Sequence, residues 1–309
     1  MPLPVTANAD LWLPFSPHGR RVKFLSVNHP QMTNAELAGL TAFIFDLDGV
    51  IWRGQTPIEG AVATVMRLRA AGKRVFYCTN NSMRPQSAFA TLLRSIGLEL
   101  EDEDVMTSSS ATALYLAGQF REPFSAYVVG GEGIVAALQR VGGHVLTGSG
   151  ISEADMAAEE VDCVVVGIDR AFNYEKMRLA QRFILNGARF IATNRDATFP
   201  TEDGVVPGAG AIVASVETAS GVSPVTIGKP RPLMVQLCLE KFNLSPATTA
   251  MVGDRLDTDI ACAHQGGIRA LYVATGVTPM AEARAATGEL RPHAFFDDLP
   301  ALGRAVLGD

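Results

Sequence analysis

Short apolar runs alternate with amphipathic stretches along this chain from residue 41 onward. An apolar run at 41–46 precedes a helical pattern at 60–71, and a run at 74–78 precedes a helix that begins near Pro85. The middle and the last third of the chain repeat this alternation. We predict further strands at 126–129, 162–166, 190–192, 225–227, 249–252 and 271–273, and helices at 132–140, 174–185, 210–219 and about 231–242. Strands that alternate with helices are typical of a parallel sheet with helices on both faces. We therefore predict an α/β fold.

The composition favours a protein that handles small molecules in the cytoplasm. The chain has 309 residues, of which 48% are apolar, and this length suggests about two domains. The net charge is −6, and the sequence lacks the basic stripe of a nucleic-acid binder and the run of about 20 apolar residues that a membrane helix needs. The four cysteines form no Cys-x-x-Cys pair, which favours reduced thiols in a cytoplasmic core.

Residues 1–31 differ from the rest of the chain. They contain five prolines, show no clear periodicity and lack the apolar segment of a signal peptide. We expect a loosely ordered extension that lies upstream of a natural start at Met32. Its deletion should leave activity and melting temperature unchanged.

The first apolar run ends in Asp46-Leu-Asp-Gly-Val. Strand side chains alternate, so Asp46 and Asp48 leave on the same face. Two neighbouring carboxylates repel each other unless a divalent cation or a shared proton compensates. Folding alone does not require such a pair, so chemistry explains it better than a polar surface turn. Asp46 would be a nucleophile that forms an aspartyl-phosphate, and Asp48 a general acid and base.

Other polar residues follow strands that lie far away in the sequence. Ligands of open parallel sheets bind beyond the carboxyl ends of the strands, so these residues should converge with Asp46 at one edge. The turn Thr79-Asn80-Asn81 would cradle an anion with its hydroxyl and backbone N–H groups, although such residues are also ordinary in turns. Lys229 would balance the charge of the nucleophile and of a phosphate, or else be a solvent-exposed lysine.

The segment after the strand at 249–252 is rich in aspartate. Asp254, together with Asp46 and the backbone carbonyl of Asp48, would hold Mg²⁺, which prefers few carboxylates. Asp259 would support a ligand or Lys229, and Asp257 would be solvated. The alternative is a helix start rich in acidic residues.

Four segments, in this order, resemble the haloacid dehalogenase superfamily of phosphatases. They are Asp-Leu-Asp-Gly-Val at 46–50, Thr-Asn-Asn-Ser at 79–82, Gly-Lys-Pro at 228–230 and Gly-Asp-Arg-Leu-Asp-Thr-Asp at 253–259. The long insert between the second and third segments, with Thr-Asn-Arg-Asp at 193–196 and Pro-Gly-Ala-Gly at 207–210, resembles subclass IIA. That subclass includes phosphatases of 4-nitrophenyl phosphate, phosphoglycolate, pyridoxal phosphate and nucleotides.

The resemblance implies a Rossmann-like core domain and an inserted α/β cap domain. The core would comprise 32–121 and 224–309, and the cap 122–223. The resemblance also implies Mg²⁺ dependence, association of two copies through their caps, and substrate contacts from a loop at about 194–209, which contains Asn194 and Asp196. In the pyridoxal phosphate branch this loop carries a histidine; the matching residue here is Phe199, which disfavours a vitamin phosphate.

We therefore expect a phosphatase that hydrolyses a small phosphomonoester through an aspartyl-phosphate. 2-Phosphoglycolate is the first candidate substrate, followed by glycerol phosphate or a sugar phosphate, and then by a nucleotide or pyridoxal phosphate. A dehalogenase needs neither Asp48 nor Asp254, and a phosphomutase fits the large cap less well. A non-catalytic metabolite-binding protein would be expected to have lost one of the acidic residues that are present here.

Overall fold

The computed structural model describes residues 30–309 except 55, 121–122, 150–159 and 202–203. The extension predicted at 1–31 lies almost wholly outside these residues. At the start of the described chain, Gln31 Nε2 donates a hydrogen bond to Pro292 O (3.1 Å). The backbone N–H of Met32 donates to His293 O (2.9 Å). The chain is therefore attached to the rest of the protein from Gln31 onward.

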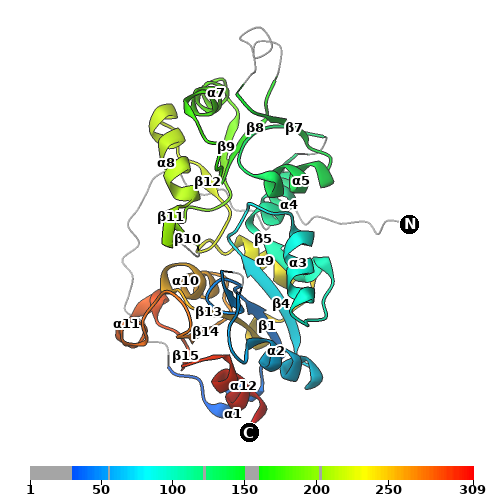
Figure 1. The fold of residues 1–309 in the computed structure, drawn as a ribbon, viewed down its shortest axis with the longest axis vertical. Helices are drawn as coiled ribbons and strands as arrows, with labels where there is room; N and C mark the ends of the chain where they lie inside the picture. The colour runs from blue at the N-terminus through cyan, green and yellow to red at the C-terminus, as the bar shows by residue number, and fades with distance from the viewer. Residues whose placement is uncertain (1–29, 55, 121–122, 150–159, 202–203) are drawn as a thin grey trace, which may run out of the picture.

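A six-stranded sheet, the core sheet, forms the lower part of the molecule in Figure 1. Its strand order is β15-β14-β13-β1-β4-β5, and every pair of neighbours is parallel. The strands are β1 (Ala42–Phe45), β4 (Arg74–Thr79), β5 (Val105–Thr107), β13 (Thr249–Gly253), β14 (Arg269–Val273) and β15 (Ala294–Phe296). This parallel arrangement confirms the predicted α/β class.

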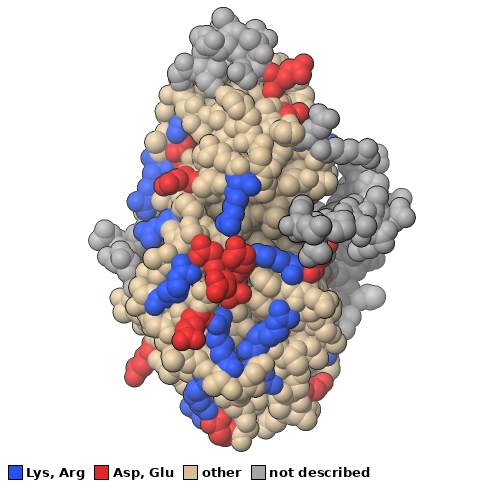
Figure 2. All heavy atoms as spheres, turned by 90° about the vertical axis from the view of Figure 1, so that its right-hand side faces the viewer, with Lys and Arg blue, Asp and Glu red and all other residues tan. Residues whose placement is uncertain are grey.

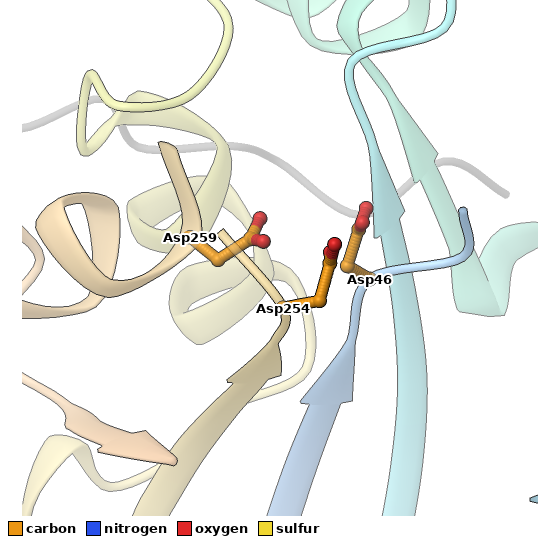
Figure 3. A group of neighbouring side chains, drawn as sticks. All are labelled: Asp46, Asp254 and Asp259. Atoms are coloured by element: carbon orange, nitrogen blue, oxygen red, sulfur yellow. The ribbon is translucent and has the colours of Figure 1, made fainter. Parts of the chain in front are cut away.

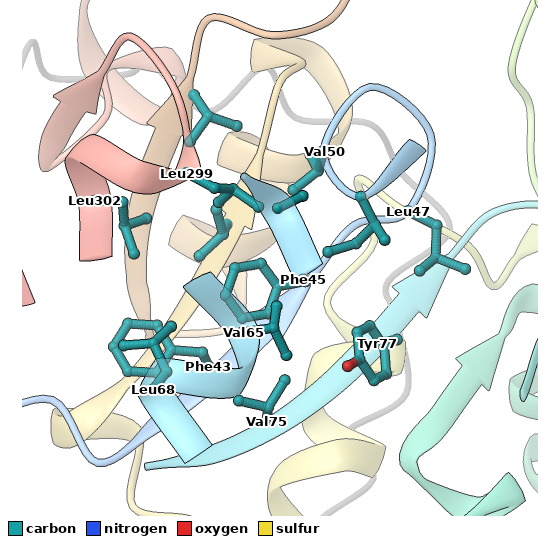
Figure 4. Packing of buried hydrophobic residues seen from close by; sticks show 14 of the residues in the cluster. Phe43, Phe45, Leu47, Val50, Val65, Leu68, Val75, Tyr77, Leu299 and Leu302 are labelled. Atoms are coloured by element: carbon teal, nitrogen blue, oxygen red, sulfur yellow. The ribbon is translucent and has the colours of Figure 1, made fainter. Parts of the chain in front are cut away.

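Helices cover both faces of the core sheet because its central strands are apolar on both sides. Phe43 and Phe45 of β1 pack in one buried cluster, whereas Ile44 packs in the other. Figure 4 shows the first cluster, in which side chains of α2 and α12 cover β1. The helices around this sheet are α1 (Asn34–Ala38), α2 (Ala61–Ala70), α3 (Gln86–Ser95), α4 (Ser108–Gln119), α9 (Leu233–Lys241), α10 (Ala261–Gln265), α11 (Met280–Ala285) and α12 (Leu299–Leu307).

A second sheet of five parallel strands lies above the core sheet in Figure 1. Its order is β12-β9-β8-β6-β7. The strands are β6 (Ser125–Val129), β7 (His144–Thr147), β8 (Cys163–Val166), β9 (Arg189–Ala192) and β12 (Val225–Thr226), and the helices are α5 (Glu132–Arg140), α7 (Tyr174–Leu185) and α8 (Ala209–Ser220). The chain thus leaves this sheet at Thr226, slightly beyond the boundary predicted at 223. The division into two domains stays a prediction.

Two small antiparallel hairpins lie outside the two sheets. One pairs β2 (Trp52–Arg53) with β3 (Thr56–Pro57), directly after the Asp46 motif. The other pairs β10 (Thr198–Thr201) with β11 (Gly204–Pro207), inside the loop predicted to contact substrate. Both hairpins belong to segments that the functional site uses.

Both signs of charge occur together on the surface. Figure 2 shows acidic side chains gathered near the middle of one face, with Lys and Arg around them. Two of the salt bridges on the surface join Asp102 to Arg94 (2.9 Å) and Glu103 to Arg140 (3.2 Å). None of the described helices combines the length and apolar character needed to cross a membrane. All four cysteines are buried and free of disulfide bonds.

Two buried tyrosines provide a matched test of the packing. The hydroxyl of Tyr77 has no hydrogen-bond partner among the described residues, whereas the hydroxyl of Tyr127 donates to Gly148 O (2.7 Å). A buried polar group without a partner destabilises the fold, and a paired one stabilises it by about 1 kcal/mol. Tyr77→Phe should therefore raise the melting temperature and Tyr127→Phe should lower it, each by a few degrees in a thermal melt. Equal shifts in the two variants would contradict this assignment.

Candidate active site

A cavity of about 270 Å³ lies between the carboxyl ends of the core-sheet strands and the second sheet. Most of the residues predicted to form the site line it: Asp46, Asp48, Thr79, Asn80, Asn81, Asn194, Asp196 and Lys229. Asp254 and Asp259 are completely buried beside Asp46. The structure therefore brings all the predicted site residues into one region.

Parallel pairing of β1 with β13 places Asp46 and Asp254 side by side. Phe45 pairs with Val252, and the backbone N–H of Asp46 donates to Val252 O (2.9 Å). Asp259 comes from η4 (Leu256–Ile260), the turn that follows β13. Carboxylate oxygens of Asp46, Asp254 and Asp259 lie within 4.8 Å of one another, and Figure 3 shows them converging.

Lys229 is buried among these carboxylates and is 3% exposed. Its Nζ donates to Asp46 Oδ1 (2.6 Å), to Asp259 Oδ1 (2.7 Å) and to the backbone carbonyl of Cys78 (3.1 Å). Burial alone would lower the pKa of Lys229, but the charges of Asp259 and Asp46 outweigh it and raise that pKa well above its usual value. The alternative of a solvent-exposed lysine is therefore wrong.

The acidic group carries more negative charge than Lys229 can balance. Burial raises the pKa of Asp46 well above its usual value, although the charge of Lys229 opposes this shift. Burial, together with the charge of Asp259, raises the pKa of Asp254 to about 7. Three carboxylates beside a single ammonium leave a deficit of positive charge, which a divalent cation would fill.

Asp254 also offers a free ligand atom. Its Oδ2 accepts a hydrogen bond from the backbone N–H of Val277 (2.6 Å), whereas its Oδ1 is buried without a hydrogen-bond partner among the described residues. A Cβ atom at Gly49 would lie 2.7 Å from Asp254 Oδ2, and Gly49 has a φ of +84°, so glycine suits this position on both counts. The donor set and the orphaned oxygen therefore fit a small oxygen-preferring cation such as Mg²⁺.

Asp48 is half-buried at the cavity wall and contacts the indole of Trp52. Trp52 Nε1 donates to Asp48 Oδ1 at 3.0 Å. Burial raises the pKa of Asp48, while the indole hydrogen bond and the charge of Lys229 act in the opposite direction. A carboxyl group with a raised pKa is suited to donating a proton.

The turn after β4 is shaped by its own side chains. Thr79 Oγ1 accepts from the backbone N–H of Asn81 (3.1 Å), and Asn81 Oδ1 accepts from the backbone N–H of Met83 (3.0 Å). Asn80 instead reaches Lys229: its Oδ1 accepts from the Lys229 N–H (2.8 Å), and its Nδ2 donates to the Lys229 carbonyl (3.0 Å). The Asn80 amide therefore fixes the backbone that carries the lysine.

Asn194 and Asp196, which the resemblance implies contact substrate, also make protein contacts. Asp196 Oδ2 accepts from Asn80 Nδ2 (2.9 Å) and from Asn194 Nδ2 (2.7 Å). Asp196 follows β9 of the second sheet, and Asn80 follows β4 of the core sheet. Their hydrogen bond therefore joins the two sheets across the cavity.

Several residues at the site were not predicted from the sequence. Trp52, which contacts Asp48, and Arg53 and Arg255, which line the cavity, were all missed. Arg255 is held by Asp257, which accepts from its Nε (3.1 Å) and Nη2 (2.8 Å); Asp257 is itself exposed, in agreement with the prediction of a solvated residue. The only available signal was that these residues adjoin the acidic motifs.

Comparisons with known proteins agree with this geometry. A haloacid dehalogenase-like hydrolase model matches residues 43–144, and a second HAD-hydrolase-like model matches residues 226–302. Glycerol-3-phosphate phosphatase of Gallus gallus is 38% identical over 86% of this chain and 88% of its own length. Chloroplastic phosphoglycolate phosphatase 1A of Arabidopsis thaliana is 35% identical over 86% of this chain and 77% of its own length.

A solved structure shows the same fold. The crystal structure of glycerol phosphate phosphatase from Mycobacterium tuberculosis in complex with magnesium has a TM-score of 0.78 and 32% identity, covering 86% of this chain and 77% of that one. Fold, motif order and relatives thus agree. The chain belongs to the haloacid dehalogenase-like hydrolase family, among the subclass IIA phosphatases that its motifs resemble.

Proposed function

We propose that this protein is a Mg²⁺-dependent phosphatase that hydrolyses small phosphomonoesters through an aspartyl-phosphate on Asp46. The proposal depends on one observation above all: Lys229 pairs with Asp46 next to a buried, unpartnered oxygen of Asp254. The relatives named for glycerol phosphate and phosphoglycolate support the substrate class.

The metal ligands proposed are the side chains of Asp46 and Asp254 and the backbone carbonyl of Asp48. Asp259 holds Lys229 in place. The magnesium complex of the Mycobacterium tuberculosis relative supports the choice of ion. When bound, Mg²⁺ neutralises charge on the phosphoryl group and orients it.

Transfer to the enzyme begins with attack of an Asp46 carboxylate oxygen on phosphorus. The bond from phosphorus to the leaving oxygen breaks, and its electron pair stays on that oxygen, which takes the proton of Asp48. The charge of Lys229 favours the ionised form of Asp46, in opposition to its burial, and attracts the phosphoryl oxygens. Thr79, Asn80 and Asn81 line the cavity, and the Thr79 hydroxyl, which accepts from the Asn81 N–H, keeps its own hydrogen to donate to the same oxygens.

Hydrolysis then returns the enzyme to its starting state. Asp48, now a carboxylate, removes a proton from water while the water oxygen attacks phosphorus. The bond between phosphorus and the Asp46 oxygen breaks and leaves its electrons on Asp46. Inorganic phosphate departs, and Asp48 is again protonated.

Asp46→Asn tests the nucleophile. Because an amide cannot form the acyl phosphate, release of inorganic phosphate from the general substrate 4-nitrophenyl phosphate in Mg²⁺ should fall by about 10³-fold or more. Asp102→Asn, which changes an acidic residue outside the cavity lining, should retain wild-type turnover. Unchanged turnover in Asp46→Asn would contradict the proposal, and no turnover in the wild type with any divalent metal would favour the non-catalytic alternative.

Asp254→Asn tests the metal ligand through stability. The folded-state pKa of Asp254 is about 7, above the usual carboxyl value, so protonation stabilises the fold at low pH and this stabilisation is lost as pH rises through 7. At pH 8 in EDTA the variant should therefore melt about 5 °C above the wild type, because asparagine stays neutral. Added Mg²⁺ should raise the melting temperature of the wild type but much less that of the variant. An equal Mg²⁺ effect in both proteins would exclude Asp254 as a ligand.

2-Phosphoglycolate remains the first proposed substrate, ahead of glycerol phosphate. Arg53 lines the cavity, and its Nη2 donates to a neutral group, the backbone carbonyl of Thr275 (2.7 Å). The Arg53 guanidinium could therefore attract a second anionic group. A substrate that carries a carboxylate besides its phosphate matches this charge better than glycerol phosphate does.

Arg53→Gln tests this preference. The variant should lower kcat/KM for 2-phosphoglycolate about fivefold more than for glycerol phosphate, as expected for the loss of one exposed ion pair. Arg304→Gln, on the exposed surface of α12, is the matched control and should change neither value. Equal losses on the two substrates would remove the argument for 2-phosphoglycolate and leave the phosphatase activity itself untouched.

A further inference from the structure

The indole of Trp52 contacts the proposed acid and base of the reaction. Trp52 Nε1 donates to Asp48 Oδ1 at 3.0 Å, and Asp48 lines the cavity. An indole N–H can only donate, so it needs a lone pair on Oδ1. The carbonyl oxygen of a carboxylic acid is a better acceptor than its hydroxyl oxygen, so this bond favours a protonated Asp48 whose proton is on Oδ2.

Trp52 itself is held firmly. Its side chain is 3% exposed and belongs to the same buried cluster as Leu47 and Val50, which are labelled in Figure 4. Its backbone N–H donates to Leu47 O (3.1 Å), and its carbonyl accepts from the Gly49 N–H (2.8 Å). Its pairing with Pro57 in the β2–β3 hairpin adds a further constraint. The turn therefore returns the indole to Asp48 in a fixed orientation.

Packing alone does not explain this arrangement. Phenylalanine could fill an apolar site of this kind, but it has no N–H to present to a carboxyl group. An indole keeps one polar atom at the edge of an otherwise apolar ring, and that atom usually finds a partner when buried. Here the partner is the group that, in the proposed reaction, donates one proton and then accepts one proton in each turnover.

We propose that Trp52 is the positioning residue of the general acid and base. This inference rests on the proposed function, in which Asp48 protonates the leaving oxygen. The indole fixes the carboxyl plane and assigns proton transfer to Oδ2. As the bond from phosphorus to the leaving oxygen breaks, its electron pair takes the Oδ2 proton; in the hydrolytic step Oδ2 recovers a proton from the attacking water.

The dependence on the leaving group provides the test. An alkoxide leaving group, as in glycerol phosphate, needs the proton, whereas 4-nitrophenolate departs readily without it. Trp52→Phe should lower kcat/KM for glycerol phosphate about 10- to 100-fold, a part of the usual effect of general acid catalysis, and should change it little for 4-nitrophenyl phosphate. The variant should also show a burst of 4-nitrophenol, because the step that needs Asp48 as a base is slowed.

Tyr77→Phe is the matched control, since it also removes one polar atom from a ring of the same buried cluster, and the Tyr77 hydroxyl forms no hydrogen bond with any described residue. It should leave the ratio of the two kcat/KM values unchanged. An equal loss on both substrates in Trp52→Phe would show that Trp52 acts only through packing, and no loss on either would also overturn the inference. If wild-type turnover does not depend on Asp46, the proposed function fails instead.

A second measurement covers the case in which Trp52→Phe does not fold. The chain has two tryptophans, so 3-benzothienylalanine can replace Trp52 alone in a Trp12→Phe background. This analogue keeps the ring shape and exchanges the N–H for sulfur. The same selective loss on glycerol phosphate is expected, and wild-type values on both substrates would refute the role of the N–H.

Discussion

The buried ammonium of Lys229 organises this molecule. A charge in the protein interior is tolerated only with partners, and Lys229 Nζ has three: Asp46 after β1, Asp259 in η4 and the carbonyl of Cys78 in β4. These acceptors come from segments that lie far apart in the sequence, so they meet only when the parallel sheet has assembled. The fold and the proposed chemistry therefore depend on the same set of contacts.

The acidic part of the site could be predicted from the sequence because it follows from strand order. Asp46 and Asp254 each follow a buried apolar strand, and parallel neighbours end at the same edge. The contacts of Asp196 could not be predicted in this way. From the sequence, an aspartate in a loop could contact either the substrate or a side-chain amide of the protein. Which of these it contacts depends on how the second sheet lies against the core sheet. Trp52 was missed for a similar reason, because no sequence pattern predicts the direction in which its indole N–H points.

The fold shows the same division between local and long-range information. The helix predicted from Tyr174 to Leu185 has these bounds in the structure, since Asn173 caps it by accepting from the N–H of Lys176. The edge strands β5, β7 and β15 were not predicted. Each has three or four residues, too few to show a period, and β7 is partly exposed.

The Asn80 amide has a mechanical consequence. Its oxygen and nitrogen bind the backbone of Lys229, and the same nitrogen donates to Asp196 on the other side of the cavity. If the second sheet tilts away from the core sheet and widens the cavity entrance, the hydrogen bond between Asn80 and Asp196 must stretch or break. The Asn80 amide also holds the backbone of Lys229, so this movement would act on the lysine as well. Entry of a ligand into the cavity and the position of the Lys229 ammonium are thus coupled through the Asn80 side chain.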